Sequence, residues 1–205
     1  MKLKENTTQR KLRGGYYTPQ KLADYITKIT LKDKKKILEP SCGDGSFLKS
    51  IKNILDNNDY NIEKIDAIEY IEEEANKSKR ILKNINNANV TNDDFYNFYV
   101  NCKDKYNLII GNPPYIQLQS MHEEADKLKK MDYKTYARTG DIYCLFYELA
   151  YKLLKKDGIL AFITSNKWMK AGYGEALRDF LATQTDPMQL IDFAGEKVFD
   201  SATVD

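Results

Sequence analysis

Histidine and cysteine are scarce in this sequence. It has one histidine, His122, and three cysteines that lie far apart, Cys42, Cys102 and Cys144. Such sparse ligands predict neither a metal site nor a disulfide framework. The single histidine lies in the charged stretch 121–124 and is expected to be solvated. Catalysis by a nucleophile paired with a histidine is therefore not expected.

Long apolar runs are also lacking. No stretch is long and apolar enough to cross a bilayer, and the polar first six residues show no apolar signal region. We therefore expect a cytoplasmic protein that has no membrane partner. The net charge of +2 is too small to indicate nucleic-acid binding by itself, so any basic surface must be local.

The composition is that of a globular protein. Of the 205 residues, 42% are hydrophobic and 30% are charged, which fits one domain with a sizeable core. Residues 1–13 are polar and basic and are expected to form a loose arm, and the domain is expected to span residues 14–205. We see no internal repeat and no low-complexity linker.

Strand-like and helix-like segments alternate along the chain. Strands are predicted at residues 37–39, 65–69, 89–91, 106–111, 158–164 and 189–193. Helices are predicted at residues 19–30, with Thr18 as N-cap, and at 46–55, 71–84, 142–155 and 174–183. This alternation predicts an α/β fold with a doubly wound, mainly parallel sheet and helices on both faces. Residues 116–140 are charged and show no clear period, which is typical of a functional loop.

The most informative stretch follows the apolar run 106–111, where residues 112–115 read Asn-Pro-Pro-Tyr. Ligands of parallel sheets lie beyond the carboxyl ends of the strands. The prolines stiffen the backbone and lack N–H groups, so the Asn112 side-chain oxygen and the Pro113 carbonyl can both accept from one NH2 group. The Tyr115 ring offers a face on which a planar base or amide can stack.

A second turn, at residues 39–45, reads Glu-Pro-Ser-Cys-Gly-Asp-Gly. Its glycines permit tight turning and close approach of a ligand. A nicotinamide fingerprint would need a glycine where Leu48 stands, and no Gly-Lys-Ser/Thr of a P-loop follows. The acid Glu39 disfavours a diphosphate and suits a cationic group, such as the methionine part of S-adenosylmethionine.

Two further acids end the second and third predicted strands. Glu69 can accept hydrogen bonds from two ribose hydroxyls, and Asp94 can accept from the amino group of an adenine. Each acid alone would more readily be a cap or a solvated charge. Three acids on successive strand ends, however, fit one adenosine-bearing cofactor.

Taken together, these motifs resemble those of S-adenosylmethionine-dependent DNA methyltransferases that act on adenine N6, in the gamma motif order of restriction–modification enzymes. The resemblance covers essentially the whole chain, including Lys-Val-Phe at residues 197–199, which is similar to the late motif whose Phe packs on a flipped base. It implies catalytic roles for Asn112, Pro113, Tyr115 and Phe199. It implies cofactor contacts for Tyr17, Thr18, Glu39, Ser41, Cys42, Gly43, Gly45, Glu69, Asp94, Phe95 and Asn112.

The resemblance also carries expectations about the whole protein. It implies the class I methyltransferase fold, normally with seven strands of which the last is antiparallel, and double-stranded DNA as substrate. Because the family's C-terminal target-recognition domain and last strand would follow residue 201, we expect a truncated chain or one part of a split enzyme. A nuclease partner is left open. The loop at residues 116–140 can close over the site, and its basic residues either contact phosphates or are solvated.

Three other functions fit parts of the pattern. Protein glutamine N5-methyltransferases share Asn-Pro-Pro-Tyr followed by isoleucine, as at Ile116, because an amide NH2 poses the same geometric problem. Residues 17–19, the Glu-Pro pair before the glycine turn, and Phe199 speak against that alternative. An RNA base methyltransferase and a cofactor-binding regulatory module without turnover are the other two.

Overall fold

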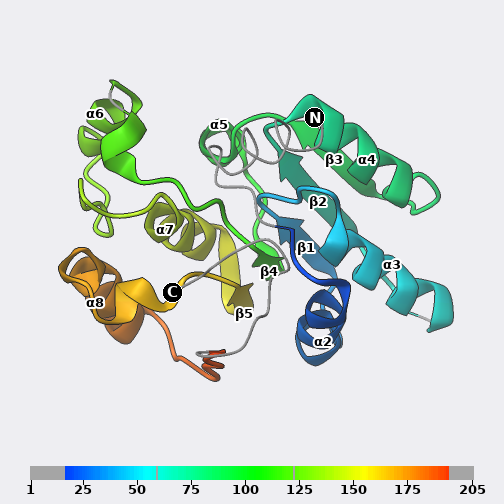
Figure 1. The fold of residues 1–205 in the computed structure, drawn as a ribbon. Helices are drawn as coiled ribbons and strands as arrows, with labels where there is room; N and C mark the ends of the chain where they lie inside the picture. The colour runs from blue at the N-terminus through cyan, green and yellow to red at the C-terminus, as the bar shows by residue number, and fades with distance from the viewer. Residues whose placement is uncertain (1–16, 59, 122, 194–205) are drawn as a thin grey trace, which may run out of the picture. The chain divides into compact units, whose positions relative to one another are not determined.

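The computed structural model describes residues 17–58, 60–121 and 123–193, which fall into two compact units (Figure 1). The sheet unit comprises Tyr17–Asn112 and Leu149–Ile163. The helical unit comprises Pro113–Glu148 and the described part of Thr164–Asp205. The expected N-terminal arm, residues 1–13, and the late motif with Phe199 lie outside the described residues.

The sheet unit is built on five strands that all pair in parallel, in the order β3-β2-β1-β4-β5. The strands are β1 (Lys36–Glu39), β2 (Lys64–Glu69), β3 (Ala88–Asn92), β4 (Tyr106–Gly111) and β5 (Leu154–Phe162). The central strand β1 places Ile37 opposite Ile65 of β2 and opposite Leu108 of β4. These three side chains are fully buried, which accounts for the apolar character of the strands.

Four helices belong entirely to this unit: α2 (Gln20–Thr30), α3 (Ser46–Asn57), α4 (Glu72–Leu82) and α5 (Phe95–Asn101). Helices α2, α3 and α4 lie side by side along the sheet (Figure 1). Leu48 and Ile51 of α3 pack into the same core as the strand side chains. This packing fixes the turn between β1 and α3 at the carboxyl edge of the sheet.

The strand order reverses next to β1. Strands β2 and β3 lie on one side of β1, and the chain then returns to form β4 on the other side. In doubly wound sheets the crevice at such a reversal is where ligands bind. Here Glu39 ends β1 and Asn112 follows the last residue of β4, so both lie at this point.

The amino edge of the sheet carries charges that are paired. Lys64 Nζ lies 2.9 Å from an oxygen of the buried Asp66 and 2.7 Å from Asp104, and Lys36 Nζ lies 2.9 Å from Asp104. The Tyr106 hydroxyl donates to Asp66 at 2.6 Å. These interactions stabilise the fold, and they contrast with the acids at the opposite edge.

The helical unit contains η1 (Leu118–Met121), α6 (Glu123–Lys129), η2 (Asn166–Met169), η3 (Gly172–Gly174) and α8 (Glu175–Gln184), together with the first half of α7 (Tyr143–Leu153). An antiparallel bridge between Gln117 and Asp141 closes the base of the segment that follows Asn-Pro-Pro-Tyr. The Leu118 N–H donates to the Gly140 carbonyl at 2.9 Å, and the Ile142 N–H donates to the Ile116 carbonyl at 2.9 Å.

Several sequence predictions need correction. Residues 116–140 are not a plain loop, because they contain η1 and α6. Strand β5 begins at Leu154 and not at residue 158, because the three consecutive charged residues at 155–157 gave its first half no strand-like pattern. Helix α5 was not predicted. Thr18 is not the N-cap of α2; Pro19 occupies that position, with φ −54° and ψ 134°, and makes no side-chain cap.

The predicted strand at residues 189–193 is also wrong. The stretch has no regular structure, and it exposes Met188, Leu190, Ile191 and Phe193. An isolated extended segment is unstable without a hydrogen-bonding neighbour, and none is found for it among the residues the structure describes. None of the helices described is both long and apolar enough to cross a membrane.

Candidate functional site

The carboxylate that ends β2 holds the glycine turn. Glu69 is 8% exposed; its Oε2 accepts from the Gly43 N–H at 2.8 Å and its Oε1 accepts from the Ile71 N–H at 2.8 Å. Burial raises the pKa of this carboxyl, and the two backbone hydrogen bonds partly offset the rise. Each carboxylate oxygen has a second lone pair, so Glu69 can still accept from a pair of ligand hydroxyls.

The carboxylate that ends β1 is the least satisfied polar group of the site. Glu39 is 2% exposed, and its Oε2 makes no hydrogen bond within the described part of the chain. Burial raises the pKa of this carboxyl well above the usual value, and the negative charges of Asp44 and Glu69 raise it further. A buried, unpaired acid at a strand end is a candidate partner for a cationic ligand.

The glycine turn needs its glycines for backbone reasons. Gly43 has φ +51° and Gly45 has φ +81°, in the left-handed region that L side chains rarely adopt. The Ser78 hydroxyl of α4 donates to the Gly43 carbonyl at 3.1 Å. A Cβ atom added at Gly43 would lie 3.8 Å from the Tyr17 ring, so the structure brings the predicted N-terminal motif against the turn.

Asn112 is held by two hydroxyl groups from the same unit. Its side-chain Nδ2 donates to Thr18 Oγ1 at 3.3 Å, and its backbone carbonyl accepts from Ser41 Oγ at 3.2 Å. The close approach of β4 to β1 explains the second contact, because a Cβ atom on Gly111 would lie 3.5 Å from the Pro40 ring. The structure thus brings together the first residue of Asn-Pro-Pro-Tyr, the glycine turn and the segment before α2.

Three predicted cofactor residues also have structural roles. Asp94 is the N-cap of α5, with its Oδ1 accepting from the Tyr96 N–H at 2.7 Å. Phe95 and Cys42 are buried, and burial raises the pKa of the Cys42 thiol, so the thiol is unreactive. A ligand contact from Cys42 would have to come from its backbone, whereas Asp94 keeps a second carboxylate oxygen. Their cofactor roles stay predictions.

The other two predicted catalytic residues with described positions, Pro113 and Tyr115, belong to the helical unit. Pro113 is buried. The Tyr115 ring packs edge-on against the ring of Tyr143, with centroids 5.8 Å apart at an interplanar angle of 63°. The Tyr143 hydroxyl in turn lies 2.9 Å from that of Tyr173. In the segment after the motif, Arg138 is ion-paired with Asp126 at 2.6 Å.

Sequence reasoning missed Tyr70 and Asn92. Tyr70 directly follows Glu69 and is 76% exposed, which is unusual for so large a ring. The Asn92 side-chain NH2 donates to the carbonyls of Glu69 (2.8 Å) and Tyr70 (2.9 Å) and so fixes the end of β2. In the sequence, the position of Tyr70 directly after the strand-ending acid Glu69 could have indicated a functional residue. The role of Asn92 is identified by the structure alone.

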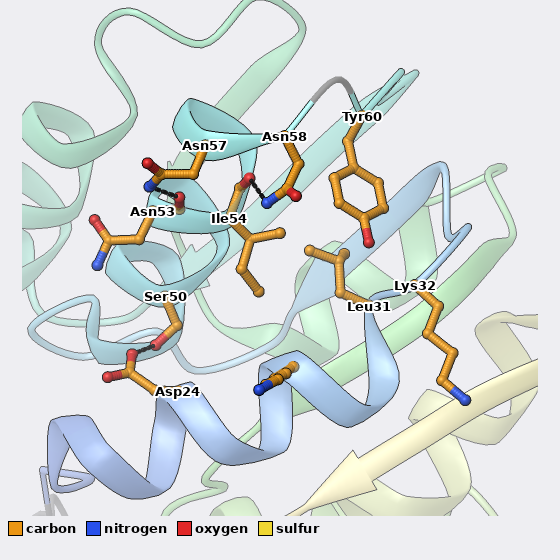
Figure 2. A pocket seen from close by; sticks show the side chains of 10 residues that line it. Asp24, Leu31, Lys32, Ser50, Asn53, Ile54, Asn57, Asn58 and Tyr60 are labelled. Atoms are coloured by element: carbon orange, nitrogen blue, oxygen red, sulfur yellow. Dashed lines mark hydrogen bonds between the residues drawn. The ribbon is translucent and has the colours of Figure 1, made fainter.

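A hollow of about 480 Å³ lies elsewhere in the sheet unit, between α2 and α3 (Figure 2). Its lining includes Asp24, Ser50, Asn53 and Tyr60, and Asp24 accepts from the Ser50 hydroxyl at 2.6 Å. None of the strand-end acids lines it. We therefore place the candidate site at the carboxyl edge and not in this hollow.

Comparison with known families agrees with this geometry. The family described as Eco57I restriction-modification methylase matches residues 10–199. The chain belongs to that family. Among its relatives, Type II methyltransferase M.BanIII of Aneurinibacillus aneurinilyticus is 31% identical over 98% of this chain and 39% of its own length. Type II methyltransferase M.HincII of Haemophilus influenzae is 30% identical over 91% of this chain and 34% of its own.

This member of the Eco57I methylase family thus spans between about a third and two fifths of the length of these curated relatives. Among solved structures, the methyltransferase subunit of a type I restriction-modification system from Streptococcus thermophilus matches with a TM-score of 0.65 and 19% identity. The match covers 82% of this chain and 39% of that one. The fold is that of class I methyltransferases, as the motifs predict.

Proposed function

We propose that the protein transfers a methyl group from S-adenosylmethionine to the N6 amino group of an adenine in DNA. The observation that carries the proposal is the buried Glu39 at the strand reversal, whose Oε2 has no hydrogen-bond partner among the described residues, with Glu69 at the end of β2 and Asn112 directly after β4. Family membership supports a DNA substrate, since relatives in the family are Type II methyltransferases.

The donor set fits this cofactor. Glu39 suits the ammonium of the methionine part, because a buried carboxylate oxygen that has no hydrogen-bond partner in the described part of the chain gains from a cation. Glu69 suits the ribose hydroxyls, with the exposed Tyr70 ring beside it as a face for the adenine. When bound, the cofactor supplies an activated methyl carbon, and the electron pair of its carbon–sulfur bond goes to sulfur as the methyl group leaves.

Asn112 and Pro113 act on the acceptor nitrogen. Adenine N6 is a poor nucleophile because its lone pair is conjugated with the ring. Hydrogen bonds from N6 to the Asn112 side-chain oxygen and the Pro113 carbonyl would favour tetrahedral geometry and stabilise the positive charge that develops. The methylated nitrogen then loses a proton to solvent, so no strong base is required before attack.

The target base has to leave the duplex to reach these groups, at a cost of a few kcal/mol. Stacking of the base on Tyr115 would return about 1–3 kcal/mol. Phe199 is proposed to add a second face, on the strength of the sequence motif alone. We also propose a restriction nuclease as partner and a cytoplasmic location, because the chain belongs to a restriction-modification methylase family.

A methyl-transfer assay with tritiated cofactor tests the proposal. The full-length protein is offered duplex DNA, ribosomal RNA and a glutamine-bearing peptide in parallel. We expect label in DNA, recovered as N6-methyladenine after digestion. Label only in the peptide would favour a protein glutamine methyltransferase, and label only in RNA would favour an RNA enzyme. Cofactor binding without any transfer would favour a regulatory module.

The Asn112→Ala variant tests the role of the motif. We expect methyl transfer to be lost while the dissociation constant for the cofactor, measured by calorimetry, stays within a few-fold of the wild-type value. Asn57→Ala is a matched control, because Asn57 is an exposed residue at the end of α3 whose side chain donates to the Asn53 carbonyl of the same helix, away from the strand-end acids. Full activity in Asn112→Ala would contradict the proposal.

A further inference from the structure

Two further tyrosines lie next to Tyr115 in the helical unit. The ring of Tyr143, the first residue of α7, packs edge-on against the Tyr115 ring, and the Tyr143 hydroxyl lies 2.9 Å from that of Tyr173 in η3. We propose that Tyr143 and Tyr173 are positioning residues, which hold the Tyr115 ring in one orientation as a stacking face for the flipped-out adenine. The inference rests on the proposed function, in which Tyr115 stacks on that base.

The backbone alone does not orient the Tyr115 ring. The prolines at positions 113 and 114 fix backbone angles, but they leave the side-chain torsions of Tyr115 unrestrained. The ring is only partly buried, so it needs a packing partner if it is to keep one orientation. Tyr143 is such a partner, because the two rings make the T-shaped contact that aromatic pairs favour, with centroids 5.8 Å apart and planes at 63°.

Tyr143 is held in place by its own surroundings. It is 0% exposed and forms a buried cluster with Cys144 and Leu177, on which Tyr115 and Tyr173 pack. Close packing of this kind restricts a side chain to one rotamer. Burial raises the pKa of the Tyr143 hydroxyl, and the hydrogen bond with Tyr173 raises it further, so the hydroxyl stays protonated. The Tyr143 ring is therefore a fixed surface for Tyr115.

Tyr173 satisfies the buried hydroxyl of Tyr143. A buried tyrosine hydroxyl needs a hydrogen-bond partner, and this pair is stable in either direction, since each hydroxyl can donate or accept. The Tyr173 hydroxyl also donates to Asp141 Oδ2 at 3.5 Å. Without the Tyr173 hydroxyl, the Tyr143 side chain would turn toward another partner, and the ring that packs against Tyr115 would move with it.

The segment that carries Tyr173 is closely packed. A guanidinium nitrogen of Arg178 donates to the carbonyls of Trp168 (2.6 Å) and Ala171 (3.1 Å). A Cβ atom on Gly174 would lie 1.8 Å from the Trp168 carbonyl oxygen, so the backbone leaves no spare room there. Tyr173 therefore presents its hydroxyl from a fixed backbone.

A ring that is oriented beforehand favours the reacting geometry. Stacking on a loose ring would cost the entropy of ordering it, and small misplacements slow enzymes strongly. We expect Tyr143→Leu, which removes the ring, to slow the transfer step about tenfold at saturating cofactor. Tyr143→Phe and Tyr173→Phe keep both rings and lose one shared hydrogen bond, so each should slow it about threefold. The double variant should be no slower than the slower single variant, because the two hydroxyls act together.

The experiment measures single-turnover rates of the full-length protein on unmethylated genomic DNA, together with the cofactor dissociation constant. Tyr106→Phe is the matched control, because Tyr106 is also 0% exposed and its hydroxyl donates to Asp66 at 2.6 Å, at the amino edge of the sheet. We expect the control to keep the wild-type rate and all variants to keep the wild-type dissociation constant. A wild-type rate in Tyr143→Leu, or equal losses in Tyr106→Phe and Tyr173→Phe, would overturn the inference.

A measurement without substrate separates this inference from the proposed function. With fluorotyrosine incorporated, the Tyr115 resonance in fluorine NMR is assigned by its loss in Tyr115→Phe. It should shift or broaden in Tyr143→Phe and Tyr173→Phe and stay in place in Tyr106→Phe. An unchanged resonance in the first two variants would overturn the inference, even if Tyr143→Leu does not fold. A wild-type protein that modifies no DNA would instead remove the proposed function, and the resonance would still decide whether the two tyrosines position Tyr115.

Discussion

The Glu39 carboxyl is buried, and the structure describes no ion pair for it. Its pKa in the folded protein is raised well above 4.5 by burial and by Asp44 and Glu69, so the folded state binds more protons than the unfolded state in the range above 4.5. The stability of the cofactor-free protein should therefore fall as pH rises through that range. A cation prefers the ionised carboxylate, so cofactor affinity should rise over the same range.

The variant Glu39→Gln should have opposite effects on stability and on binding. Without cofactor at pH 7 it should melt at a higher temperature than the wild type, and its melting temperature should depend less on pH. Its affinity for S-adenosylmethionine should fall about tenfold or more, because a charge-assisted hydrogen bond is lost. Thermal melts at pH 5 and pH 8 and calorimetry measure both effects. Equal affinity in variant and wild type would exclude the proposed ammonium contact.

The two glycines of the turn should differ in their tolerance of alanine. Both have positive φ, but a Cβ atom at Gly45 would overlap Ile81 Cδ1 and lie 3.0 Å from Ser78 Oγ, whereas Gly43 has room. Urea denaturation should show that Gly45→Ala costs more stability than Gly43→Ala, by no more than about 1 kcal/mol, because the end of the Ile81 side chain can move aside. Equal losses would mean that backbone strain alone sets the cost.

At the scale of elements, a buried acid anchors the segment that follows Asn-Pro-Pro-Tyr. Glu148 of α7 is buried, and its Oε2 accepts from the Thr135 N–H at 2.9 Å and from the Thr135 hydroxyl at 3.1 Å. Glu148→Ala would leave the buried N–H of Thr135 without this acceptor. We expect a loss of about 2–4 kcal/mol in the free energy of unfolding and faster proteolysis within residues 123–139.

Two further variants make this test specific. Glu148→Gln keeps an acceptor oxygen and should lose less stability than Glu148→Ala. Glu175→Ala, at an exposed acid in the first turn of α8, should change stability by no more than about 0.5 kcal/mol. If Glu148→Ala and Glu175→Ala were equally stable, Glu148 would not anchor the segment.

The elements that the sequence predicts well are those with strong local patterns. The apolar run ending at Gly111 and the helix beginning at Ser46 have clear periods and clear ends, and both are confirmed. Helix α6 was missed because most of its seven residues are charged. Residues 189–193 have a strand-like pattern, but a strand also needs a neighbour, and pairing is not encoded within five residues.

At the scale of the whole molecule, motif order predicts which strand ends meet. The structure confirms that Glu39 and Glu69 end two strands of one parallel sheet and that Asn112 directly follows a third, so all three lie at the carboxyl edge that parallel strands share. The contacts between motifs could not be predicted. The hydrogen bond between Thr18 and Asn112 joins residues far apart in sequence, and either residue alone fits several roles.

The same edge of the sheet has a consequence for the abundance of the protein in a cell. There the negative charges of Asp44 and Glu69 add to burial in raising the pKa of Glu39, so they oppose its ionisation in the free protein. Under the proposed function, S-adenosylmethionine at one hundred times its dissociation constant would favour the folded form by about 2.7 kcal/mol. The supply of methionine in the cell would then affect how much of this protein escapes degradation.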